Sequence, residues 1–305
     1  AVDGVSFSVE KGRILGIVGE SGCGKSVTSM SILQLLGSNA RISGGSIKLD
    51  GKELIGLPEK EMCRIRGNDI AMIFQDPMTA LNPTLTIGTQ LMEPIMLHQN
   101  CGKKEAWTRA VDVLKRVGIA APEKRMKEYP HQLSGGMRQR VMIAMAVSCE
   151  PRLLIADEPT TALDVTIQAQ ILELMCELRE KMGTAIMLIT HDMGVVAETA
   201  DDVLVLYAGK AVEYGSIEDI FERPKHPYTQ GLLNSIPRLD EDVELLNTIE
   251  GTVPAPDAMP AGCRFAPRCP YSTEECRADI PPYRQVEPGH FVRCNRCKAQ
   301  EEVTK

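Results

Sequence analysis

The sequence predicts an α/β fold in which helices cover a mainly parallel sheet, followed by a loop-rich C-terminal module. Short β-branched apolar runs alternate with helical patterns through the first two thirds of the chain, and this alternation is typical of parallel sheets with helices on their faces. After about Phe221, eleven prolines interrupt any regular pattern. We therefore expect one domain at residues 1–222 and a second at residues 223–305.

Seven apolar runs are expected to form strands. Five should build the parallel sheet, at residues 14–18, 70–74, 153–156, 185–190 and 203–207. Two early runs, at residues 5–9 and 46–49, are expected to form an antiparallel β side sheet, because turn residues flank the second of them. No strand-like run occurs between Asp76 and Val147. Apolar spacing there suits amphipathic helices, so we expect a helical subdomain at about residues 76–147 inserted in the α/β core.

Composition limits the possible functions. The 305 residues are 43% apolar, enough for one large domain and a smaller one. No apolar run approaches the ~18 residues needed to cross a bilayer, so a membrane role requires a partner. Net charge is −7 with scattered Lys and Arg, which argues against nucleic acid as a partner. Residues 1–15 resemble no secretory signal, so we expect the cytosol. Since Ala1 precedes a strand-like run, we expect the chain to begin inside a longer one.

A phosphate-binding loop (P-loop) is predicted directly after the run at residues 14–18. Residues 19–26 match the G-x-x-x-x-G-K-S motif, with a strand before them and a helical pattern after them. The glycines let successive backbone N–H groups face phosphates. Lys25 should reach the β- and γ-phosphates, and the Ser26 hydroxyl should ligate Mg²⁺. The expected nucleotide-binding residues are Gly19, Glu20, Ser21, Gly22, Cys23, Gly24, Lys25 and Ser26. A plain glycine-rich turn is the alternative, which the flanking strand and helix disfavour.

Cys23 lies inside this loop, near Lys25 and a helix N-terminus. Both influences favour the thiolate, so we expect Cys23 to be alkylated readily and ATP to protect it.

Two adjacent acids end the apolar run at residues 153–156. Side chains alternate along a strand, so Asp157 and Glu158 should point in different directions and hold different roles. Asp157 should bind Mg²⁺, through water. Glu158 should orient or deprotonate the water that attacks the γ-phosphate. A solvated turn is the alternative, and the P-loop in the same chain makes the catalytic interpretation the better one.

A second phosphate-binding feature is predicted at Ser134, Gly135 and Gly136, which precede a helical run at residues 137–149. A helix N-terminus with small residues binds anions through its free N–H groups. The alternative is that Ser134 only caps the helix.

The P-loop, the LSGGMRQR run at residues 133–140, the LLIADE run at residues 153–158 and the Ala162-Leu163-Asp164 run together resemble the nucleotide-binding subunits of ABC transporters. The resemblance covers about residues 1–220. It implies that two such subunits pack head to tail, so that Ser134, Gly135 and Gly136 complete the ATP site on the partner's P-loop. It also implies that Gln75 senses the Mg²⁺-bound nucleotide and that His191 contacts the γ-phosphate.

A narrower resemblance is carried by residues 74–83 (FQDPMTALNP), 129–132 (YPHQ) and 226–229 (HPYT), which are similar to the ATPases of dipeptide and oligopeptide importers. It implies an ATP-hydrolysing translocase subunit on the cytoplasmic face of the inner membrane. Its implied partners are a second ATPase subunit, identical or paralogous, two integral membrane permease subunits and an extracytoplasmic substrate-binding protein. Nickel or oligosaccharide importers share this resemblance. A soluble ABC ATPase of DNA repair or translation is the rival class, but its usual coiled-coil insertion is missing here.

Five of the ten cysteines lie at positions 263, 269, 276, 294 and 297. In a reducing compartment such a cluster suggests a metal site more than disulfides. Zinc is one reading, since Cys294 and Cys297 have a common zinc spacing and His290 could contribute. Widely spaced thiolates on a proline-rich loop can instead hold an iron–sulfur core. The peptide-importer resemblance implies a [4Fe-4S] cluster on Cys263, Cys269, Cys276 and Cys294, with Cys297 as a spare or a competitor of Cys294.

Overall fold

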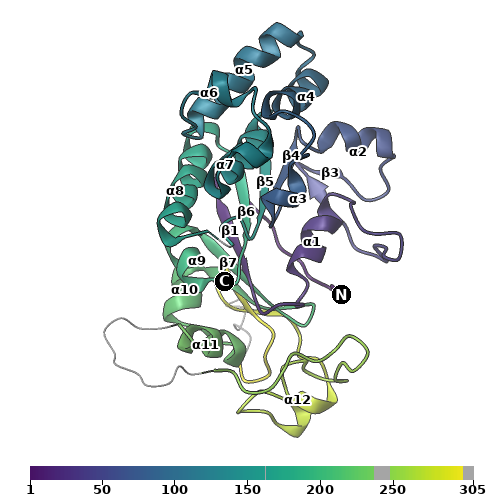
Figure 1. Ribbon diagram of the computed structural model, residues 1–305. Coiled ribbons are helices and arrows are strands. Elements are labelled where there is room, and N and C mark those ends of the chain that lie inside the picture. Colours follow the sequence, from purple (N-terminus) through teal and green to yellow (C-terminus); the bar gives the residue numbers. More distant parts are fainter. Residues whose placement is uncertain (162, 237–247, 298–305) are drawn as a thin grey trace. The chain divides into compact units, whose positions relative to one another are not determined.

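The computed structural model describes residues 1–161, 163–236 and 248–297 (Figure 1). Ala162 lies outside the described residues, as do residues 237–247 and 298–305 of the expected C-terminal module. The chain forms two compact units. The first unit comprises residues 1–8, 14–28 and 190–305, and the second comprises residues 9–13 and 29–189. This division differs from the expected one at residues 222 and 223, which stays a prediction.

The second unit contains three parallel strands, and each of them matches a predicted run to within a residue. They are β4 (Ile70–Ile73), β5 (Leu153–Asp157) and β6 (Ala185–Ile189). β5 lies between the other two, pairing Ile70 with Leu153 on one side and Leu153 with Ala185 on the other. All five residues of β6 are buried. An apolar run buried on both faces is what a central parallel strand requires.

The second unit also contains most of the helices. They are α2 (Glu59–Ile65), α3 (Pro77–Ala80), α4 (Ile87–Gln99), α5 (Lys103–Arg116), α6 (Pro122–Arg125), the short 3₁₀ helix η1 (Pro130–Gln132), α7 (Gly135–Val147) and α8 (Val165–Met182). Helices α4 to α7 gather in one group (Figure 1). On α5, Ala110, Val111 and Leu114 are buried. The prediction of helices without strands between Asp76 and Val147 is therefore confirmed.

The antiparallel side sheet is smaller than predicted. Its described strands are β2 (Lys48–Leu49) and β3 (Lys52–Glu53), which pair with each other in a short hairpin. Residues 5–9 are not a strand, so that part of the prediction is wrong. Their apolar residues do alternate with polar ones, but Val5, Phe7 and Val9 remain only half-buried. Alternation alone does not make a strand, because a strand also needs a hydrogen-bonded neighbour.

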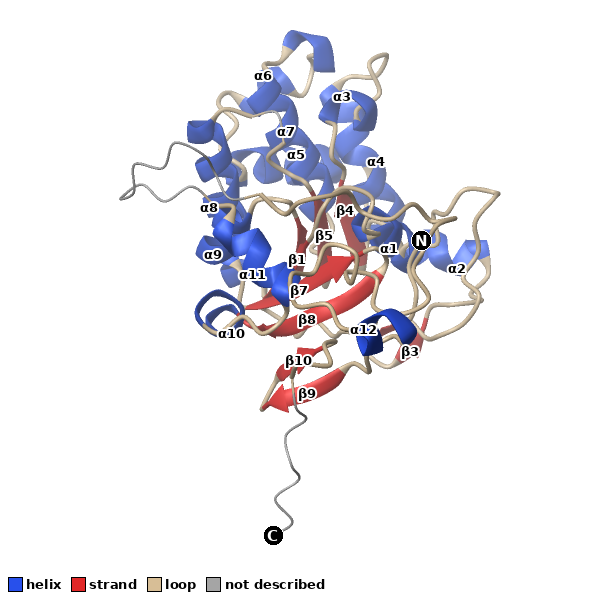
Figure 2. Cartoon of the chain, turned by 90° about the horizontal axis from the view of Figure 1, so that it is seen from below, coloured by secondary structure: helices blue, strands red, loops and turns tan. Residues whose placement is uncertain are grey.

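The first unit contains β1 (Ile14–Val18) parallel to β7 (Asp202–Tyr207). β8 (Lys210–Ser216) runs antiparallel to β7, and β10 (His290–Val292) and β9 (Arg284–Glu287) extend the sheet from there (Figure 2). Its helices are α9 (Met193–Thr199), α10 (Ile217–Glu222), α11 (Pro227–Asn234) and α12 (Glu274–Ala278), and α1 (Lys25–Ile32) begins in it. Gly16 lets α9 approach β1, since a Cβ there would lie 2.9 Å from Val196 Cγ1.

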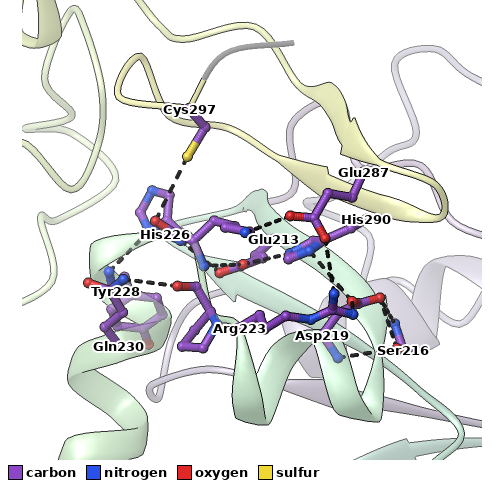
Figure 3. Close-up of polar contacts among 12 residues, drawn as sticks. Glu213, Ser216, Asp219, Arg223, His226, Tyr228, Gln230, Glu287, His290 and Cys297 are labelled. Atoms are coloured by element: carbon purple, nitrogen blue, oxygen red, sulfur yellow. Dashed lines mark hydrogen bonds and ion pairs between the residues drawn. The ribbon is translucent and has the colours of Figure 1, made fainter. Parts of the chain in front are cut away.

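The residues after Phe221 are more regular than predicted, because β9 and β10 join the sheet. Glu213, fully buried in the middle of β8, is the reason. Its carboxylate accepts hydrogen bonds from the backbone N–H groups of Lys225 (2.7 Å) and His226 (3.0 Å) and contacts His290 Nε2 at 2.8 Å (Figure 3). A buried carboxylate must be hydrogen-bonded. His290 links β10 to β8 in this way, and the N–H groups of Lys225 and His226 link the segment before α11 to β8.

Within the described parts of the chain, no helix is both long enough and apolar enough to cross a membrane.

Candidate functional site

The predicted P-loop is a tight turn between β1 and α1. Gly19, Gly22 and Gly24 have φ values of 151°, 79° and 107°, which favour glycine. A Cβ at Gly19 would lie 2.2 Å from the backbone oxygen of Leu206, and one at Gly24 would lie 3.1 Å from the backbone oxygen of Ala1. Gly19 and Gly24 are therefore required for both conformation and space, and Gly22 for conformation alone. Successive backbone N–H groups in such a turn form an anion-binding concavity.

Lys25 is the first residue of α1 and is 7% exposed. Its Nζ donates to the backbone oxygens of Gly19 (2.6 Å) and Glu20 (3.3 Å), so the ammonium group lies over the loop. Ser26 follows it and is exposed. A helix N-terminus, a curled glycine-rich backbone and a lysine together suit a polyphosphate, and the neighbouring hydroxyl suits its Mg²⁺.

Cys23 departs from its predicted reactivity. The residue is 0% exposed. Its Sγ lies 4.0 Å from Lys25 Nζ, but burial outweighs this charge and raises the thiol pKa. The prediction of a reactive thiolate is therefore wrong, because desolvation disfavours the charged form more than Lys25 favours it.

His191 belongs to the first unit, as the P-loop does. It is exposed in the turn between β6 and α9. Two bonds shape this turn: Thr190 N donates to the Ile17 backbone oxygen near the end of β1 (3.2 Å), and Asp192 caps α9 by accepting from Gly194 N (2.8 Å). The turn therefore lies beside the end of β1 from which the P-loop departs.

Asp157 is the last residue of β5 and Glu158 follows it, in the second unit. Because Glu158 lies outside the strand, the expectation from strand alternation does not apply to it, but the two residues differ in burial. Asp157 is 5% exposed, whereas Glu158 is half-buried. Glu158 has a φ of 48°, rare for a residue other than glycine. Its backbone N–H donates to the Ile189 oxygen at 2.8 Å, which holds the strained residue in place. Strained backbone of this kind is often found at functional sites.

Two side chains orient the Glu158 carboxylate. Gln75 Nε2 and Thr161 Oγ1 donate to the same Glu158 Oε2, at 2.9 Å and 3.0 Å. The structure thus brings the predicted residues Gln75 and Glu158 together. Sequence reasoning missed Thr161, although its position three residues after Glu158 in a turn was a usable signal.

Ser134, Gly135 and Gly136 form the start of α7, as predicted. The Ser134 side chain accepts from Met137 N at 3.4 Å and so caps the helix. Gly136 fits closely against α8, since a Cβ there would lie 3.2 Å from Ile167 Cγ2. One turn later, Gln139 is almost fully buried and donates to the backbone oxygen of Pro159. Gln139 thus ties α7 to the loop after Glu158, a link that sequence reasoning missed.

The predicted residues are divided between the two units. The first unit holds the P-loop residues, His191 and the C-terminal cysteines. The second unit holds Gln75, Asp157, Glu158 and the start of α7. Glu158 and the side chains that hydrogen-bond to it therefore belong to one unit, and the glycine-rich loop belongs to the other.

Four cysteines line one cavity of the first unit. The cavity is lined by Cys263, Cys269, Cys276 and Cys294 together with His226, Pro227, Phe265, Ala266, Tyr271, Pro281, Asn295 and Arg296. Cys263 N donates to the Cys276 backbone oxygen at 2.7 Å. A Cβ at Gly262 would lie 2.4 Å from that same oxygen, so the close approach needs glycine. Burial raises the thiol pKa of Cys263 and of Cys269, and the neighbouring Cys276 and Cys294 raise both further.

Cys297 and His290 lie apart from this lining. Cys297 Sγ is 3.9 Å from the Lys225 backbone oxygen, and its interaction with Cys294 lowers the pKa of the Cys294 thiol. His290 instead contacts Glu213 (Figure 3). The side chains of the cavity lining that could ligate a metal are therefore four thiols and the imidazole of His226, whose Nδ1 already accepts a hydrogen bond from Tyr228 N, whereas His290 is not in the lining.

Comparison with protein families gives two matches. A family described as ABC transporter matches residues 2–161, and a family described as oligopeptide/dipeptide transporter, C-terminal region, matches residues 212–276.

Individual proteins match over nearly the whole chain. The oligopeptide transport ATP-binding protein AppD of Bacillus subtilis is 57% identical over 96% of this chain and 90% of its own length. OppD of Escherichia coli, an oligopeptide transport ATP-binding protein, is 53% identical over 96% of this chain and 87% of its own. DppD of the same organism, a dipeptide transport ATP-binding protein, is 51% identical over 97% and 90%. Among solved structures, the dimeric ATP-binding cassette MJ0796 bound to ADP and Pi is 28% identical, with a TM-score of 0.63 over 71% of this chain and 90% of that chain.

Proposed function

Because the chain belongs to the ABC transporter family, as an ATP-hydrolysing member with the oligopeptide/dipeptide C-terminal region, we propose that it powers the import of peptides across a membrane. We infer that the cargo is a peptide from the match of residues 212–276 to the oligopeptide/dipeptide transporter region. The P-loop alone would not indicate a cargo, because many unrelated ATPases share it. Relatives named for oligopeptide and dipeptide transport support the same class.

The residues of this chain divide the work of hydrolysis. The P-loop backbone and Lys25 bind and orient the phosphates. Ser26 of the first unit and Asp157 of the second are the residues that would each offer an oxygen ligand to Mg²⁺. Gln75 supports the Mg²⁺ site and the Glu158 carboxylate, to which it is hydrogen-bonded at 2.9 Å. Glu158 orients the attacking water and accepts its proton. His191 contacts the γ-phosphate. ATP, when bound with Mg²⁺, would supply the phosphoanhydride bond that water breaks, and the metal would partly neutralise the charge of the phosphate oxygens.

The start of α7 has a role in a second subunit. Ser134, Gly135 and Gly136 form a capped helix N-terminus suited to phosphate, but they belong to a chain with one P-loop. We propose that they complete the ATP site of a partner ATPase, which is identical or paralogous. Two membrane permeases and an extracytoplasmic substrate-binding protein complete the transporter. This chain then works at the cytoplasmic face of the inner membrane, and closure and reopening of the ATPase pair drive transport.

Reconstitution tests this proposal. The transporter is purified through a tag on this chain, its subunits are identified by mass spectrometry, and it is inserted into proteoliposomes with ATP on the ATPase side. We expect permeases to copurify and labelled peptides to accumulate only with ATP. Accumulation of nickel or an oligosaccharide, without accumulation of peptide, would show that the cargo is not a peptide. A preparation without membrane subunits would favour a non-transport ATPase.

The cavity lined by Cys263, Cys269, Cys276 and Cys294 fits a [4Fe-4S] cluster, because such clusters are held by four thiolates. We propose that these four cysteines hold one. Phe265 is a large apolar side chain of the cavity lining, but the chain around these cysteines has few others. Because so few apolar side chains cannot hold such a segment in one conformation, the role we assign to the metal is structural. The alternative is that the same four thiolates bind zinc, and metal analysis of the purified protein distinguishes the two.

A further inference from the structure

Arg268, next to one of the cavity cysteines, binds the P-loop residue Glu20 within the first unit. Its Nη1 donates to Glu20 Oε2 at 2.6 Å and its Nη2 donates to Glu20 Oε1 at 3.0 Å. This is the bidentate geometry of a strong arginine–carboxylate pair. The arginine side chain is 5% exposed and the glutamate side chain 29% exposed. The pair is therefore partly withdrawn from water, unlike a surface salt bridge.

The rest of the guanidinium group is also satisfied. Nε donates to the Glu250 backbone oxygen and Nη2 to the Ile249 backbone oxygen, both at 2.9 Å. Nη1 also contacts Tyr207 Oη at 3.4 Å. Five N–H groups thus have five acceptors, which is the full capacity of an arginine. A lysine could not reproduce this arrangement, because it lacks the planar fork.

A second contact holds the same P-loop residue. The backbone N–H of Glu20 donates to Tyr228 Oη at 2.9 Å. Tyr228 is fully buried at the start of α11, and its ring packs on Tyr207 and Phe265 at centroid distances of 4.6 and 5.4 Å. Phe265 lines the cysteine cavity. Both the side chain and the backbone of Glu20 are thus fixed by residues that follow the ATPase motifs in sequence.

Glu20 is an unfavourable residue for binding phosphate unless its charge is neutralised. It is the second of the eight residues Gly19–Ser26, so its carboxylate lies within about one Debye length, ~10 Å at 0.1 M salt, of phosphates bound to the loop. Like charges at this separation repel. Arg268 cancels this charge and fixes the position of Glu20 at the same time.

We propose that Arg268 is a positioning residue for nucleotide binding, through which the C-terminal region sets the affinity of the P-loop for phosphates. It acts through Glu20 and touches no nucleotide itself. The proposal concerns nucleotide binding and holds whatever the cargo of the transporter.

Nucleotide affinity in the purified transporter tests this inference. ATP and ADP binding are measured by calorimetry in EDTA, which prevents hydrolysis. Arg268→Gln should weaken ATP binding about tenfold, as expected for an uncompensated charge beside the ligand, and weaken ADP binding less, because ADP carries less charge. Glu20→Gln combined with Arg268→Gln should recover affinity to within about threefold of the wild type, since no charge is left unpaired. Arg277→Gln, an exposed arginine on α12, is the charge-matched control and should bind normally.

A purely structural role gives different results. It would weaken ATP and ADP equally, and the double variant would be no better than Arg268→Gln. Either result, or wild-type affinity in Arg268→Gln, would overturn the proposal. If Arg268→Gln proves unstable in thermal unfolding, Arg268→Lys carries the test, because it keeps the charge. It should weaken ATP binding only about threefold, and a loss as large as tenfold would also contradict the neutralisation argument.

Discussion

The side-chain amide of Gln75 donates a 2.9 Å hydrogen bond to the Glu158 carboxylate, although 82 residues separate them in the chain. Gln75 follows β4 and Glu158 follows β5, and these strands are parallel neighbours. The carboxyl ends of parallel neighbours meet at one edge of the sheet, where open α/β sheets bind ligands. The contact therefore follows from the strand order and orients the acid expected to act on water.

Replacing Glu158 by Gln should leave ATP binding intact and lower ATP turnover by about 10²-fold or more, the usual contribution of a general base. The amide keeps the shape of the side chain but cannot accept the proton of water. Steady-state phosphate release by the reconstituted transporter measures turnover, with binding followed separately. Glu173→Gln, at an exposed position on α8, is the control. Wild-type turnover in the Glu158 variant would remove Glu158 from catalysis.

Thr161→Val should reduce turnover about fivefold, because it removes a hydrogen bond to Glu158 Oε2 and a typical bond contributes about 1 kcal/mol. Valine keeps the shape of threonine, so ATP affinity should stay unchanged. Thr108→Val, at an exposed position on α5, makes the same substitution away from the site. Equal turnover in the two variants would show that Gln75 alone is enough to orient the acid.

Ser134→Arg should abolish hydrolysis while the P-loop still binds ATP, because the arginine would fill the space proposed for the partner's γ-phosphate. The substitution also removes the cap on Met137 N, which costs about 1 kcal/mol of helix stability. Ser134→Ala isolates that loss, since it removes the cap without filling the space. We expect the alanine variant to keep substantial activity. Full activity of the arginine variant would contradict the two-subunit ATP site.

Cys23 should react slowly with iodoacetamide at pH 7.5, at least about tenfold more slowly than the exposed Cys63, because burial raises its thiol pKa and blocks access. Mass-spectrometric mapping over time gives both rates in the same sample. Comparable rates would restore the expectation of a reactive thiolate in the P-loop.

The sequence alone was enough to predict the features that depend on neighbouring residues in the chain. Apolar runs predicted β1, β4, β5, β6 and β7 to within about a residue, because buried parallel strands need continuous apolar side chains. The P-loop and the cap at Ser134 could likewise be predicted, because each is specified by a short sequence motif.

What the sequence could not predict depends on distant partners. β8 was missed because Glu213 at its centre is a charged residue, and its burial depends on His290 and on the backbone of residues 225 and 226. The hydrogen bonds of Arg268 to Glu20 are a similar case. In each, a polar group is stabilised by a neighbour that only the tertiary fold provides.

The metal content of the C-terminal region is the last prediction. Protein purified without oxygen should be brown and contain iron and acid-labile sulfide, and Cys269→Ser should lose both, because it removes one of four thiols lining a single cavity. Cys297→Ser decides between Cys294 and Cys297 as the fourth ligand: the Cys297 Sγ interacts with Cys294 but lies outside that lining, near the Lys225 backbone oxygen, so this variant should keep iron and sulfide. Loss of both in the Cys297 variant would make Cys297 a ligand in place of Cys294. Stoichiometric zinc without sulfide would refute the cluster and leave the four cysteines as a zinc site.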